Sequence, residues 1–151
     1  MEMTVRNFKW HAAEISRQFG IVVVYEERLA RDQAMVLRLR GELLGPIDRL
    51  MGLKEGVVFA RPIDDDTSYA VVMHEVGHHV APNGYCLLPE PKPGCHTRDR
   101  FEYAAAKLVA EEAAWEWARY YVEQVFVWTI GMESVYQSVI RSYVYARRTG
   151  R

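Results

Sequence analysis

Apolar residues recur at helical spacing in three long segments of the chain. The first segment spans residues 4–19 and places five apolar side chains on one face: Val5, Phe8, Ala12, Ile15 and Phe19. Gly20 follows it and is typical of a helix C-terminus. Residues 98–128 carry the longest pattern, and residues 132–148 carry the last one after Gly131. We therefore expect an N-terminal helix, a long helix and a C-terminal helix.

Two β-branched runs, residues 21–27 and 56–63, have the length and composition of strands. The second run contains Pro62 near its end, which suits a strand terminus or a sheet edge, where an extended peptide could add as a further strand. Residues 28–44 fit two interpretations. We favour a helix in the first part, but residues 35–41 could instead form a strand, and residues 47–52 could form a short helical turn.

A fourth helix is predicted over residues 68–80. The sequence Asp-Asp-Asp-Thr at 64–67 precedes it and supplies good N-cap residues, whose negative charge suits the positive end of a helix. Pro-Asn-Gly at 82–84 ends it. Residues 82–97 then hold four of the six prolines and predict an irregular loop.

The fold class that these elements indicate is α+β, with the N-terminal helix and a small sheet packed on helix 68–80. The length of 151 residues favours one domain, 1–151. With 19 basic and 20 acidic residues the charges nearly cancel, so we expect no nucleic-acid partner. The N-terminus lacks the apolar core of a signal peptide, and no stretch is long and apolar enough for a membrane span, so we expect a cytoplasmic protein.

Residues 74–78 read His-Glu-Val-Gly-His inside the predicted fourth helix. His74 and His78 are four residues apart, so both imidazoles lie on one face and can reach a single metal ion. Glu75 lies about 100° round the helix and could take a proton from a metal-activated water. Gly77 costs about 1 kcal/mol in a helix interior, which suggests that another backbone packs closely against it.

An open metal site needs a third protein ligand. The sequence offers several candidates: Glu111, Glu112, Glu116, His96, Cys86 and Cys95. We favour Glu112, because Glu112 and Glu116 share a helical face and Glu116 could accept the outer N–H of a ligating histidine. Glu111 is the nearest competitor or a supporting carboxylate. The two cysteines are expected to remain thiols.

HEVGH followed by Glu112 and Glu116 on a later helix resembles the gluzincin metallopeptidases. The small size and the acidic downstream helix are similar to the minimal ImmA/IrrE-like metallopeptidases of bacteria and phages, over about residues 56–120. The spacing from His78 to Glu112 is longer than in the thermolysin group, and the proline-rich loop accounts for the excess. The resemblance implies a small zincin-like domain, bound Zn²⁺ and the hydrolysis of peptide bonds.

The sequence therefore predicts a zinc-dependent metallopeptidase acting on a protein or peptide substrate. His74, His78 and Glu112 would bind the ion, and Glu75 would be the general base. A tyrosine among Tyr69, Tyr85 and Tyr103 could stabilise the oxyanion. The alternative is a non-catalytic, zinc-stabilised binding or regulatory protein of phage or bacterial origin.

Overall fold

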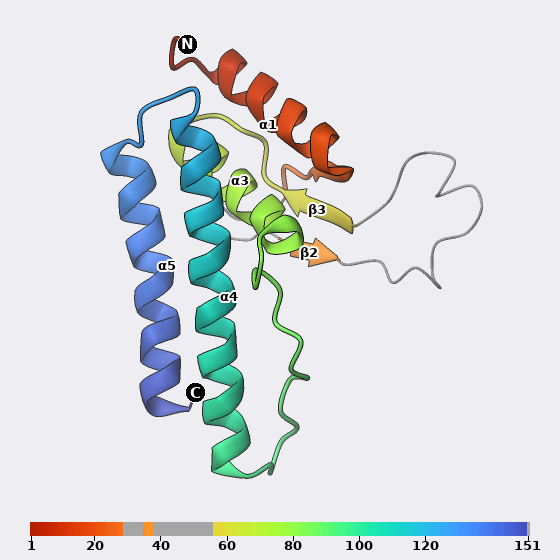
Figure 1. Ribbon diagram of the computed structural model, residues 1–151, viewed down its shortest axis with the longest axis vertical. Helices are drawn as coiled ribbons and strands as arrows, with labels where there is room; N and C mark the ends of the chain where they lie inside the picture. Colours follow the sequence, from red (N-terminus) through yellow and green to blue (C-terminus); the bar gives the residue numbers. More distant parts are fainter. Residues whose placement is uncertain (29–34, 38–55, 151) are drawn as a thin grey trace, which may run out of the picture.

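The computed structural model of the chain describes residues 1–28, 35–37 and 56–150 (Figure 1). In chain order its elements are α1 (Val5–Phe19), β1 (Ile21–Tyr25), β2 (Met35–Leu37), β3 (Gly56–Ala60), α3 (Asp66–Val80), α4 (Thr97–Glu123) and α5 (Ile130–Thr149). This is a mostly helical α+β arrangement, so the coarse fold class is confirmed. The four helices of the described residues occur where the sequence predicted them.

The helix ends follow from local capping chemistry. The side chain of Thr4 accepts a hydrogen bond at the start of α1, and Gly20 ends that helix with a positive φ of 71°. Asp65 and Ser68 form a reciprocal capping box at the start of α3. Thr129 caps α5, and its hydroxyl also donates to a carboxylate oxygen of Asp66 at 2.5 Å. The first turns of α3 and α5 are therefore tied to each other.

The described strands form one three-stranded sheet in the order β1-β3-β2. β3 pairs in parallel with β1 and antiparallel with β2. Pro62 lies just past the end of β3, as the interpretation of a strand terminus expected, whereas the sheet-edge alternative is wrong because β3 is the central described strand. β2 lies within the alternative strand 35–41. The helix favoured in the first part of residues 28–44 falls mostly outside the described residues, and the turn at 47–52 lies outside them entirely.

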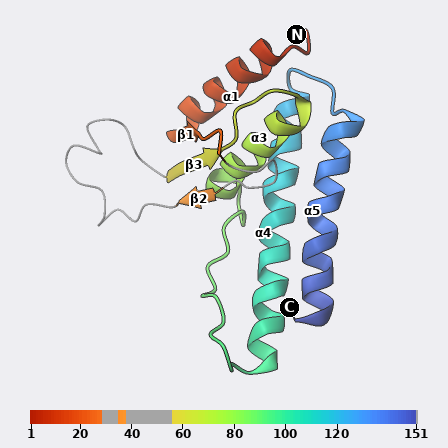
Figure 2. The same ribbon diagram turned by 180° about the vertical axis from the view of Figure 1, so that it is seen from behind.

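α3 lies at the centre of the molecule, with α1 and the sheet on one side and α4 and α5 on the other (Figures 1 and 2). Its inward side chains join one buried core, in which the largest fully buried residues include Tyr69, Met73, Val76, Trp115 and Met132. α4 and α5 run antiparallel and side by side, and the segment after α3 descends along α4 to the start of that helix. Because α3 is packed on every side, its polar residues meet side chains from other elements.

In the part of the chain that the structure describes, none of the helices combines the length and the apolar character that crossing a bilayer needs.

Candidate metal centre

His74 and His78 lie together on the α3 face that meets α4, with ring centroids 4.5 Å apart. Both Nε2 atoms converge on one carboxylate, that of Glu111. Nε2 of His74 lies 2.6 Å from Oε2 of Glu111, and Nε2 of His78 lies 3.2 Å from Oε1. His74 and Glu111 are buried, and the His78 side chain is largely covered. α3 and α4 thus bring three ligand-type side chains to one point.

Gly77 explains how α4 approaches so closely. A Cβ atom at position 77 would lie 2.7 Å from the carbonyl oxygen of Ala114, which is closer than real Cβ atoms come to other atoms. Only glycine therefore fits between the two backbones. Ala114 is three residues beyond Glu111, so this contact fixes the turn of α4 that carries the carboxylate. The helix propensity lost at Gly77 is the cost of placing Glu111 against the histidines.

The loop after α3 orients the second imidazole. Nδ1 of His78 lies 2.7 Å from the carbonyl oxygen of Gly84, so Nδ1 carries the proton and donates it. This contact turns Nε2 of His78 toward Glu111, where its lone pair would be available to a metal ion. Gly84 is needed for this contact, because a Cβ there would lie 2.6 Å from the carbonyl oxygen of Gly77. A backbone carbonyl that fixes a histidine tautomer is typical of metal sites.

Glu75 flanks the pair from the other side. Its Oε1 lies 3.2 Å from Nδ1 of His74, and the residue is 9% exposed. Of the two carboxylates, Glu111 faces both Nε2 atoms, whereas Glu75 contacts the far nitrogen of one ring. This difference assigns Glu111 to the position between the histidines and leaves Glu75 at the edge of the site.

The charges of this cluster are strongly coupled. Burial lowers the pKa of His74, but hydrogen bonds and charge from Glu111 and Glu75 outweigh it and raise that pKa to about 9. Burial likewise raises the pKa of Glu111, and its hydrogen bonds to His74 and His78 overcome this and hold it well below its usual range. A buried imidazolium therefore balances the carboxylates when no other cation is bound.

Trp115 packs against the ring of His74. Its indole stacks on the imidazole with centroids 4.1 Å apart and planes 12° apart, and Tyr136 also stacks on the indole. Trp115 is fully buried. It lies one turn after Glu111 on α4, so the same helix face supplies both the carboxylate and the apolar support.

A cavity of about 500 Å³ opens over the cluster and is lined by His74, Glu75, His78 and Glu111 together with three tyrosines, Tyr85, Tyr103 and Tyr143. Of these three tyrosines, Tyr143 on α5 is the one that interacts with Glu111 through its hydroxyl. Burial and the charge of Glu111 raise the pKa of its phenol, so Tyr143 is protonated at neutral pH. Tyr143 was not among the tyrosines that the sequence suggested.

Tyr69, which the sequence did suggest, lies elsewhere. It is fully buried, stacks on Phe8 and has its hydroxyl 2.5 Å from Nδ1 of His11. It does not line the cavity and belongs to the core between α1 and α3. Tyr85 and Tyr103 remain at the cavity wall.

The preference for Glu112 as third ligand is corrected by this geometry. Glu112 and Glu116 are exposed, whereas Glu111 is 5% exposed and contacts both histidines. One residue along a helix turns a side chain by about 100°, which is enough to move it from the core to solvent. Glu116 therefore does not support a histidine in the way that the sequence suggested.

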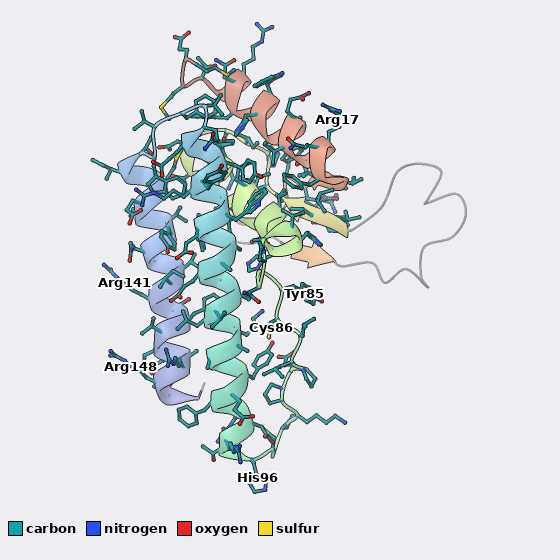
Figure 3. All side chains as sticks on the ribbon, viewed as in Figure 1. Arg17, Tyr85, Cys86, His96, Arg141 and Arg148 are labelled. Carbon is teal, nitrogen blue, oxygen red and sulfur yellow. The ribbon has the colours of Figure 1, made fainter. Side chains whose placement is uncertain are left out.

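His96 is also removed from the site. It directly precedes α4, so Glu111 lies about 20 Å further along the helix axis. Figure 3 places His96 at the end of the molecule opposite α1, while Tyr85 and Cys86 lie beside the middle of α4. Both cysteines are free thiols. Cys86 lines the cavity, and Cys95 does not.

The residues present fit a divalent metal ion. His74, Glu75 and His78 offer ligand atoms that all lie within 4.8 Å of one another, and Glu111 adds a carboxylate between the two Nε2 atoms. Imidazole nitrogen and carboxylate oxygen suit several divalent ions. The fixed tautomer of His78 and the tightly packed glycines indicate a preorganised set of donors.

Comparison of the chain with models of known protein families, with curated proteins and with solved structures found no match.

Proposed function

We propose that the chain is a zinc-dependent peptidase of the gluzincin type, in which His74, His78 and Glu111 hold the ion and Glu75 is the general base. The observation that carries the proposal is the convergence of both Nε2 atoms on Glu111, beside a second buried carboxylate and under an open cavity. Two histidines, one carboxylate and an accessible position form the donor set that catalytic zinc uses.

In this proposal Glu75 and Tyr143 have separate roles in hydrolysis. Bound zinc supplies a Lewis acid and lowers the pKa of water to about 7. Glu75 accepts the proton of the attacking water and delivers it to the leaving amine nitrogen. Tyr143, held protonated, donates a hydrogen bond to the substrate carbonyl oxygen as negative charge develops there.

Trp115 and the Gly84 carbonyl do not touch the substrate in this proposal. They hold the two imidazoles in orientation, Trp115 by stacking on His74 and Gly84 by accepting from His78. Orientation of this kind maintains the metal geometry through the reaction.

The test compares Glu75→Gln with Glu112→Gln, which makes the same change at an exposed position one helix away. Zinc-loaded wild type and both variants are incubated with a mixture of natural peptides, and new termini are identified by mass spectrometry. We expect cleavage by the wild type and by Glu112→Gln, and none by Glu75→Gln, although that variant still binds one zinc ion per chain. Equal cleavage by Glu75→Gln and the wild type would remove Glu75 from the mechanism.

A second candidate is the non-catalytic, zinc-stabilised binding or regulatory protein. The observation in its favour is that the cluster joins α3 to α4 at the middle of the core, where a bound ion would also stabilise the fold. It predicts that zinc removal unfolds the chain and that no peptide is cleaved. Helicity measured during zinc titration, together with the peptide digest, separates the two functions.

A further inference from the structure

α4 presents three functional side chains one turn apart on a single face. Tyr103, Lys107 and Glu111 are spaced by four residues, so they stack along the helix. All three line the cavity above the histidines. Lys107 is therefore about 6 Å along the helix axis from Glu111 and faces the same space.

A second cavity of about 300 Å³ adjoins the first between α4, α5 and the loop after α3. The two cavities share Tyr103, Lys107 and Tyr143 as lining residues. Most of the remaining wall is small or apolar: Pro91, Ala104, Ala146 and Gly150. The second cavity therefore suits an aliphatic or aromatic side chain, and Lys107 stands at its entrance from the metal site.

Lys107 has no counter-ion among the residues that the structure describes. Two other cations on α4 are paired, Arg98 with Glu102 and Arg119 with Glu123. Among the described residues Lys107 has no ion pair or hydrogen bond, although its side chain is partly buried. Glu90 lines the second cavity but forms no ion pair with Lys107. Arg100 also lines this cavity, and it donates a hydrogen bond to the Thr97 hydroxyl.

The two carboxylates of the proposed metal site form no ion pair with Lys107. Glu75 and Glu111 contact the histidines at 2.6–3.2 Å. A partly buried lysine beside an apolar cavity is complementary to a ligand with a carboxylate close to an apolar group.

From this arrangement we propose that the peptide recognised at the site carries a carboxylate next to an apolar side chain, within two residues of the bond that is cleaved. Lys107 binds the carboxylate, and the second cavity holds the apolar side chain. The spacing follows from an extended peptide, which rises about 3.3 Å per residue, so about 6 Å corresponds to two residues. The inference rests on the proposed peptidase function and specifies its substrate.

The carboxylate could be the C-terminus of the peptide or the side chain of an aspartate or glutamate. The binding experiment uses the zinc-loaded Glu75→Gln protein and fluorescein-labelled alanine-rich pentapeptides ending in leucine. One peptide has a free C-terminus, one has a C-terminal amide, and one has the amide with aspartate before the leucine. Fluorescence anisotropy gives the dissociation constant of each.

Lys107→Met is introduced into this protein and compared with Lys107→Arg and with Lys9→Met, which removes the same charge from an exposed position of α1. We expect Lys107→Met to weaken binding of at least one carboxylate peptide by roughly tenfold and to leave the neutral amide unchanged. Lys107→Arg should retain the preference. The peptide that loses affinity identifies the source of the carboxylate. The inference is overturned if the parent protein binds all three peptides with the same affinity and Lys107→Met leaves those affinities unchanged.

Cleavage by the wild type separates this inference from the proposed function. If the natural peptide mixture is cut without enrichment of a carboxylate within two residues of the cleaved bond, the recognition by Lys107 is wrong and the peptidase stands. If nothing is cut but binding depends on Lys107, the recognition of a carboxylate by Lys107 stands and the peptidase fails. If no peptide is bound or cut, both are overturned.

Discussion

The indole of Trp115 lies flat against the imidazole of His74, with ring centroids 4.1 Å and planes 12° apart. This contact joins a metal-site histidine of α3 to the core face of α4. Since Trp115 is buried, we expect it to influence the site through His74 and the packing around it.

Replacing Trp115 with phenylalanine should therefore affect metal binding as well as stability. The smaller ring leaves space beneath His74, which should lower the free energy of unfolding by about 1–3 kcal/mol and weaken zinc binding by about tenfold. Urea unfolding and competition with a zinc-binding dye measure the two effects. Trp10→Phe, at a half-exposed position on α1, should change neither.

Glu111→Gln and Glu112→Gln differ by one position and should differ greatly in zinc affinity. Loss of the Glu111 carboxylate should weaken binding by more than about 100-fold, because even residues that only orient ligands cost 10- to 100-fold. Glu112 is exposed, so its substitution should leave the affinity unchanged. Isothermal titration with zinc measures both. If Glu112→Gln had the larger effect, the assignment of the third ligand would be reversed.

Gly77→Ala should destabilise the protein although alanine is the better helix former. The new methyl group would meet the Ala114 backbone at 2.7 Å, and a backbone cannot move aside as a flexible side chain can. We expect α3 and α4 to separate, with a loss of about 1–3 kcal/mol in stability and weaker zinc binding. Thermal unfolding monitored by circular dichroism provides the measurement.

Gly131→Ala is the matched comparison for Gly77→Ala. Its nearest neighbour would be an Asp66 carboxylate oxygen at 3.0 Å, which is further away than the Ala114 oxygen and belongs to a side chain that can shift slightly, so the cost there should be smaller. An equal or greater loss of stability at Gly131 would mean that the close approach at Gly77 is not what positions α4.

The sequence predicted α3 and α4 well because their signals are local. His74 and His78 share a face through helical spacing alone, and capping residues mark the start of α3. The choice between Glu111 and Glu112 depended on which face of α4 is buried. Leu108, Glu111, Trp115, Ala118 and Val122 form a buried stripe spaced by three and four residues. Trp115, one turn after Glu111, was the signal that placed Glu111 on the inner face.

Other features could not be predicted from local patterns. β3 became the central strand because β2 pairs on its far side, and strand order depends on contacts between distant segments. Tyr143 reaches Glu111 only because α5 folds back along α4. In each case the deciding contact joins residues that are remote in the chain, which hydrophobic periodicity does not report.

Tyr143→Phe should slow peptide hydrolysis without preventing zinc binding. The variant retains the ring but loses the hydroxyl that hydrogen-bonds Glu111 and faces the cavity. Removing one donor to a developing oxyanion typically lowers kcat by about 100-fold or more. Tyr145→Phe, exposed on the same helix, is the control. A change confined to KM would assign Tyr143 to substrate binding instead.

The stability of the zinc-free protein should decrease as the pH rises from 6.5 to 9. The pKa of His74 is raised from 6.5 to about 9 in the folded chain, so between these values the folded state holds a proton that the unfolded state has released. That proton stabilises the folded state fully below pH 6.5, and its contribution of up to about 3 kcal/mol is lost by pH 9.

The zinc-loaded protein should not show this loss of stability between pH 6.5 and 9. Zinc requires the neutral imidazole, so the ion competes with the proton on His74 and binds more tightly as the pH rises. Urea unfolding at pH 6.5, 7.75 and 9, with zinc and with a chelator, provides both curves. Parallel curves would mean that zinc does not displace the His74 proton, and would place the ion away from His74, His78 and Glu111.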